Sequence, residues 1–196
     1  MKESSEALDA EAITRLFTRD GQYLCARWGR PVAPVIFGLD DISLAVFRDA
    51  TKAVIAHARH PLAETDPEMG ANMMSFFVRD WDELAELPDL DRLTGQAGLA
   101  ERLKRQDAGQ YRLFRFDADG AIRACMNFVN MGGKLAEVHP AHLAEAFAVN
   151  SMLTFAHDVT PTPELAALIR AAYDPVMPPV SRDSSHALRL AARMSH

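Results

Sequence analysis

The chain has 196 residues, of which 48% are hydrophobic and 24% charged, and its formal net charge is −6. This length is sufficient for a domain with a buried core, and the composition is that of a globular protein and not of a disordered chain. The 21 basic residues form no cluster or stripe, which argues against a nucleic-acid partner and against an anionic membrane surface.

The two cysteines, Cys25 and Cys125, lie far apart in the sequence. The start of the chain lacks the features of a signal peptide, and no stretch reaches about 18 apolar residues. These features predict a cytoplasmic protein with reduced thiols, although a chain trimmed of a leader would look the same. We expect one globular domain over residues 1–196.

Apolar periodicity and turn residues divide the chain into helices and strands. Pro31 and Pro34 make the second predicted strand an edge strand or an irregular one. In chain order, the pattern predicts a helix at 4–19, strands at 22–28 and 32–37, a helix at 41–58, a strand at 72–78, helices at 80–87 and 90–106, strands at 110–116 and 121–130, and helices at 140–155, 163–173 and 182–194.

Several predicted boundaries have a chemical reason. Asp40 or Asp41 can cap the helix at 41–58, Thr162 can cap the helix that Pro163 begins, and Ser181 can cap the last helix. The clearest local signal is the alternation at 110–116, followed by a turn that contains Gly120, which predicts a β-hairpin. The order of elements predicts an α+β fold, with an antiparallel sheet that has its hairpin near 110–130 and is packed by about six helices.

Motifs for common chemistry are weak. Gly132, Gly133 and Lys134 follow a strand and precede a helix, which could suit a phosphate, but a loop that needs positive φ explains the glycines better. The carboxylates at 64–68 and 80–83 flank opposite ends of one strand, so they cannot form one acid–base pair. Apolar neighbours indicate that Cys125 is an inert buried thiol.

The strongest metal candidates gather near one predicted helix. His139, His142 and Glu145 are spaced three and three, and His157 or Asp158 could add a ligand from the other end of the helix. Zinc prefers such nitrogen and oxygen ligands, although the spacing spreads the outer pair around the helix by roughly 120°. A partly exposed helix start is the competing interpretation, and it requires no cofactor.

Three segments together resemble an uncharacterised bacterial family described as zincin-like: RWGRPV leading to VIFG at 27–38, GAN at 70–72, and LIRAAYDP at 168–175. The resemblance implies a metal-binding helix near 141–147, with the family's His, Glu and His at positions 141, 142 and 145. This chain has Ala141, His142 and Glu145 there, and it lacks the family's export signal. The resemblance therefore implies the scaffold without its metal chemistry.

The sequence leaves three functional hypotheses. The first is a non-catalytic binding or regulatory module for an unknown protein or small molecule, with an apolar groove near Met73 and Met74, no cofactor, and a homodimer as one form it could take. The alternative is a zinc-dependent hydrolase that uses the cluster at 139–158. The third is a small-molecule enzyme whose acidic loop at 64–68 closes over its substrate.

Overall fold

The structure is a computed structural model that describes residues 8–195, and it confirms the α+β class. The helices in this range are α1 (Ala10–Leu16), α2 (Asp41–His57), α3 (Trp81–Ala85), α4 (Leu90–Thr94), α5 (Leu99–Arg105), α6 (Pro140–Asn150), α7 (Pro163–Ala172) and α8 (His186–Met194). The strands are β1 (Thr18–Arg19), β2 (Gln22–Tyr23), β3 (Cys25–Ala26), β4 (Pro34–Phe37), β5 (Met73–Val78), β6 (Gln110–Phe116), β7 (Ile122–Asn130) and β8 (Val180–Ser181).

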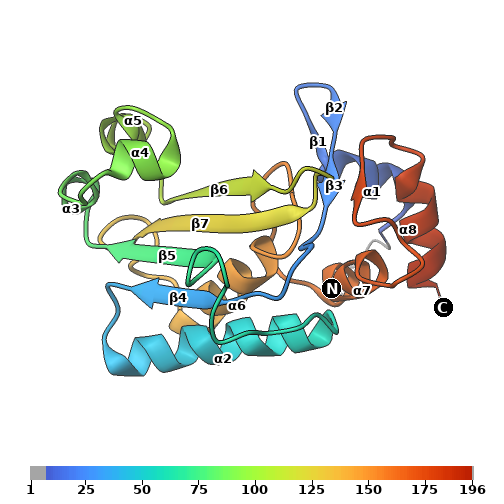
Figure 1. The fold of residues 1–196 in the computed structure, drawn as a ribbon, viewed down its shortest axis with the longest axis horizontal. Coiled ribbons are helices and arrows are strands. Elements are labelled where there is room, and N and C mark those ends of the chain that lie inside the picture. Colours follow the sequence, from blue (N-terminus) through green and yellow to red (C-terminus); the bar gives the residue numbers. More distant parts are fainter. Residues whose placement is uncertain (1–7, 196) are drawn as a thin grey trace, which may run out of the picture.

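The main sheet has four strands in the order β4-β5-β7-β6 (Figure 1). The β6–β7 hairpin is antiparallel, as predicted near 110–130, and β4 is the predicted edge strand. The expectation of an antiparallel sheet is corrected, because β4–β5 and β5–β7 are parallel pairs. Helix α2 returns the chain to the end of the sheet where β4 begins, so that β5 can pair parallel with β4. After β5, the helices α3 to α5 lead into β6, which runs back across the sheet, so β7 pairs parallel with β5.

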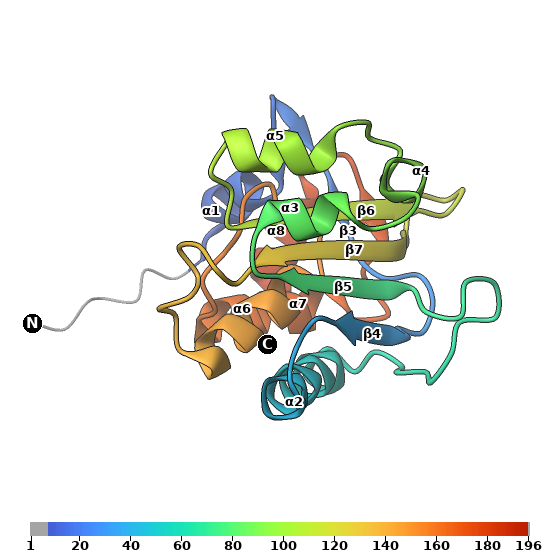
Figure 2. The same cartoon turned by 90° about the vertical axis from the view of Figure 1, so that its left-hand side faces the viewer.

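Helices cover both faces of this sheet (Figure 2). On one face, α2 and α6 pack on Phe77 and Val129, and on the other face α3 to α5 pack on Met126 and Phe128. A further part of the core lies where α1, α7 and α8 gather at one end of the sheet (Figure 1). There Trp28 is 1% exposed, and its indole N–H donates to the Ser151 carbonyl at 2.9 Å.

Most predicted boundaries agree with the structure, and the exceptions have local causes. Asp40 and Thr162 cap α2 and α7, but Ser181 belongs to β8, so the last helix begins at His186. The helix expected at 140–155 ends at Asn150, whose side chain bonds to the backbone of Val159. Residues 4–7 of the first predicted helix lie outside the described range.

Candidate functional site

A groove lies between strand β6, the β1–β2 hairpin and the segment 154–158, and we call it the β6 groove. Its volume is about 520 Å³, within the range of pockets that hold small organic ligands. Its wall combines aromatic and aliphatic side chains with polar ones, and Phe17 and Phe155 stack at a ring distance of 5.2 Å. The apolar and aromatic lining residues are Phe17, Leu24, Tyr111, Leu113, Phe114, Phe116, Phe155 and Ala156.

One side of the groove carries a convergent set of polar side chains. The Arg112 guanidinium donates to a carboxylate oxygen of Asp158 at 2.7 Å and to Oδ1 of Asn127 at 2.9 Å. Gln110 also donates to Asp158, at 2.6 Å. The Arg112 side chain is only 12% exposed, whereas Asp158 is 46% exposed. The guanidinium is therefore held in a fixed orientation between the interior and the groove.

Behind Arg112, the polar contacts continue into the core through Asn127. The Asn127 amide donates to Ser75 Oγ at 3.4 Å, and its Oδ1 accepts from Ser151 Oγ at 3.5 Å and from the Cys125 thiol at 3.7 Å. Burial raises the pKa of the Cys125 thiol to about 12, and Arg112, Asn127 and Ser151 only partly oppose this. The thiol is thus protonated at neutral pH, and the network positions Arg112 without supplying a nucleophile.

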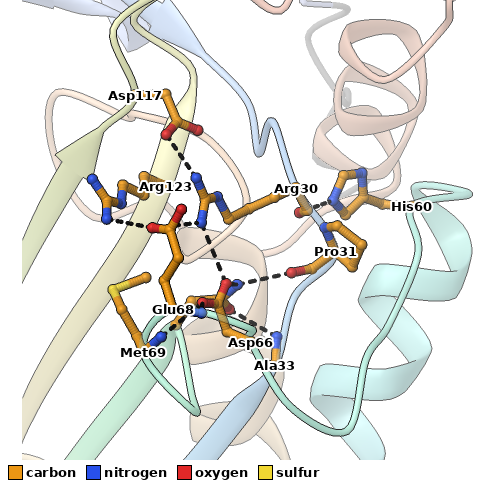
Figure 3. A network of polar contacts seen from close by, with 10 residues as sticks. Arg30, Pro31, Ala33, His60, Asp66, Glu68, Met69, Asp117 and Arg123 are labelled. Atoms are coloured by element: carbon orange, nitrogen blue, oxygen red, sulfur yellow. Dashed lines mark hydrogen bonds and ion pairs between the residues drawn. The ribbon is translucent and has the colours of Figure 1, made fainter.

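The acidic loop at 64–68 belongs to a second polar cluster, which is centred on Arg30 (Figure 3). Arg30 pairs with Asp117 at 2.8 Å, with Glu68 at 3.4 Å and with Asp66 at 3.5 Å. Arg123 adds a second contact to Glu68 at 2.5 Å. Two arginines thus face three carboxylates, and the charges largely compensate one another inside the cluster.

Asp66 anchors this loop to the rest of the fold. Burial raises its pKa, but hydrogen bonds from the Glu68 and Met69 N–H groups and from Asn72, together with the nearby positive charge of Arg30, outweigh burial and hold the pKa below its usual range. Asn72 is fully buried, and it also donates to the Pro31 carbonyl and accepts from the Ala33 N–H. These contacts fix the loop in place, so they offer no support for a lid that closes over a substrate.

The metal candidates lie around α6 and beyond it. His139 caps α6 through its ring nitrogen, which accepts from the Ala141 N–H at 3.2 Å, and its ring lies 5.5 Å from that of His142. Glu145 is an exposed residue of the same helix, and His157 lines the β6 groove. Within residues 8–195, no three His, Cys, Asp or Glu side chains form a group that could hold a metal ion. The structure thus brings together two of the four candidates.

Other residues singled out from the sequence have structural roles. A Cβ on Gly132 would lie 1.9 Å from the Arg79 carbonyl oxygen, and neither Gly132 nor Gly133 has positive φ, so close backbone packing explains the first glycine. Lys134 pairs with Asp107 at 2.6 Å. Met73 is buried in one part of the core and Met74 packs against another, so the two side chains do not line one groove.

Sequence reasoning missed Arg112, Gln110 and Asn127 as site residues. A usable signal was present, because Asn127 is a lone amide inside the otherwise apolar strand segment at 124–129, and a buried amide requires hydrogen-bond partners. Arg112 faces Asn127 directly in the β6–β7 register. This cross-strand pairing could have identified Arg112 as an inward-facing charge.

Comparisons with protein-family models, with curated proteins and with solved structures found no match to this chain. The zincin-like resemblance accordingly stays a prediction. No helix in the described part of the chain has both the length and the apolar character that a membrane span requires.

Proposed function

We propose that this protein is a non-catalytic binding module whose ligand lies in the β6 groove, with an apolar group among the phenylalanines and an acidic group facing Arg112. The observation that carries the proposal is the fixed, largely buried Arg112 guanidinium beside an open apolar wall. Arginine is well suited to this role because its planar fork recognises carboxylates with defined geometry.

The charge of the groove supports an acidic ligand. Arg19 and Arg112 line it together with one carboxylate, Asp158. Arg19 donates to the Ala156 carbonyl, so it also helps to hold the groove-lining segment 154–158. The half-exposed Asp158 is the group that a ligand carboxylate would displace from Arg112.

The proposal can be tested with N-acetyl-L-phenylalanine as a probe and its uncharged amide as the control ligand, followed by amide chemical shifts in NMR titrations. We expect the acid to shift signals from β6 and from segment 154–158, and to bind more tightly than the amide. Arg112→Gln should weaken binding of the acid about tenfold or more, as the loss of a charged hydrogen bond does. Arg115→Gln is the matched control, because Arg115 lies outside the groove lining.

Equal binding of the acid and the amide, or equal effects of the two arginine substitutions, would contradict this proposal. Shifts confined to other surfaces would do the same.

Zinc-dependent hydrolysis is the alternative, and the proximity of the His139 and His142 rings supports it. A catalytic zinc ion usually has three protein ligands, so Glu145 or His157 would have to complete the site by moving. Metal analysis of protein expressed with ample zinc tests this directly. Less than about 0.1 zinc per chain would exclude it, because such sites bind zinc tightly.

A further inference from the structure

Strand β6 is an edge strand with a free side. The Asn130 N–H donates to the Gly109 carbonyl at 2.9 Å, which sets the phase of the antiparallel ladder. In such a ladder the backbone groups of every second residue bond to the partner strand. The N–H and C=O groups of the odd-numbered residues of β6 therefore point toward β7. The peptide groups of Gln110, Arg112 and Phe114 therefore point away from the sheet. Within residues 8–195, no backbone or side-chain hydrogen bond is present to them.

The β6 groove runs along this free side. Residues 110 to 114 line it without interruption, so side chains from both faces of β6 and the strand edge between them border the same space. An occupant would meet outward N–H and C=O groups repeated every second residue, at a spacing of about 7 Å. Only an extended polypeptide presents donors and acceptors with that repeat.

We propose that the natural occupant is an extended segment of another protein, which adds a strand to β6 and places an Asp or Glu side chain against Arg112. This inference rests on the binding function proposed above and specifies its partner. Main-chain hydrogen bonds would supply much of the affinity, and the apolar wall and Arg112 would supply the specificity.

A second copy of this chain fits the same edge less well. If two β6 strands paired about a two-fold axis through Arg112, the two Arg112 residues would lie directly opposite each other. Like charges at that position destabilise a strand pair. An acidic partner strand instead complements Arg112 and Arg19, the two arginines that line the groove.

The test begins with a displayed library of random 12-residue peptides, selected on the full-length protein and then synthesised. Each selected peptide is scanned by methylating one backbone nitrogen at a time. We expect losses of about tenfold or more at every second position and little change between them, since only alternate N–H groups face β6. The selected peptides should share an acidic residue whose contribution disappears in Arg112→Gln.

Two variants of the protein complete the test. Gln110→Pro removes an outward N–H that takes no part in the β6–β7 ladder, and Gln110→Ala removes the same side chain while keeping the N–H. Peptide affinity should fall at least fivefold further in the proline variant than in the alanine variant. Circular dichroism and the unfolding midpoint of both variants confirm that they fold.

Selection of no peptide, or a methylation scan without alternation, would overturn the inference. If N-acetyl-L-phenylalanine still binds through Arg112 in that case, the proposed binding function survives and only the peptide partner is wrong. Sedimentation of the protein over a range of concentrations tests whether a second copy of the chain occupies the groove instead. A dimer that Gln110→Pro abolishes and Gln110→Ala retains would make a second copy the occupant, and would also overturn the inference.

Discussion

Replacing Asp158 by asparagine should lower stability and raise ligand affinity at the same time. The substitution preserves the size of the side chain and removes the charge that pairs with Arg112 at 2.7 Å. Gln110 can still bond to the amide oxygen, so the change isolates the ion pair. The same Arg112 guanidinium would then be available to the acidic group of a ligand.

The magnitude follows from the unequal burial of the two partners. Arg112 is 12% exposed, and a charged hydrogen bond in such a setting contributes about 1.5–3 kcal/mol. Asp158 is 46% exposed, and solvent screening reduces exposed pairs to about 1 kcal/mol or less. We therefore expect a coupling energy of about 1 kcal/mol. If the ligand carboxylate no longer competes with Asp158, affinity should rise by the equivalent factor, about fivefold.

The assay is a double-mutant cycle with Asp158→Asn, Arg112→Gln and both together, measured by urea unfolding. Calorimetric titration with N-acetyl-L-phenylalanine gives the affinities of the same four proteins. A coupling energy below about 0.3 kcal/mol would refute the stability argument, because that is the error of additivity for independent sites. A weaker affinity in Asp158→Asn would refute the competition argument and would make Asp158 part of the binding surface.

Three further predictions concern the stability of the fold. Asn72→Ala removes three buried hydrogen bonds, one of them to the Asp66 carboxylate, and should cost about 3–5 kcal/mol in urea unfolding; a cost below 1 kcal/mol would contradict the anchoring role. Gly132→Ala should cost about 3 kcal/mol through the Arg79 carbonyl, and the control Gly133→Ala, which meets only a side chain at 3.4 Å, less than about 1 kcal/mol. Burial, and to a lesser extent the charge of Arg189, lower the pKa of the His186 side chain in the folded protein. The unfolded chain therefore binds the proton at a higher pH than the folded chain, so the free energy of unfolding should fall as the pH drops below 6.5, and should fall less steeply in His186→Leu.

Local chemistry predicted most of the elements. The alternation at 110–116 and the turn at Gly120 gave the β6–β7 hairpin, and Asp40 and Thr162 marked two helix starts. These signals are visible in sequence because the interacting residues lie close along the chain. The parallel pairing of β4, β5 and β7 was not predicted, because it depends on which strands become neighbours in the sheet. That choice is decided by packing between segments that are distant in the sequence.

The candidate site shows the same division. Alternation predicts that the side chains of Arg112 and Tyr111 point to opposite faces of β6. It does not reveal that the segment 154–158 returns to the face on which Arg112 lies. The metal hypothesis gave weight to histidines that are near one another in sequence, and of these the structure brings together the rings of His139 and His142. A helix start places neighbouring residues close in space without making their side chains converge, whereas Asn127 and Arg112 meet across two strands.

A free edge strand is ordinarily a hazard, because unpaired N–H and C=O groups can pair with any other chain. In β6 two features limit that pairing. Arg112 and Arg115 place charge on opposite faces of the strand, and the β1–β2 hairpin and segment 154–158 wall the free side into a groove. An incoming strand must therefore be narrow enough to enter the groove and must match the charge of Arg112. An edge so restricted would disfavour open-ended association and still accept one selected segment, which is the property that the proposed binding module requires.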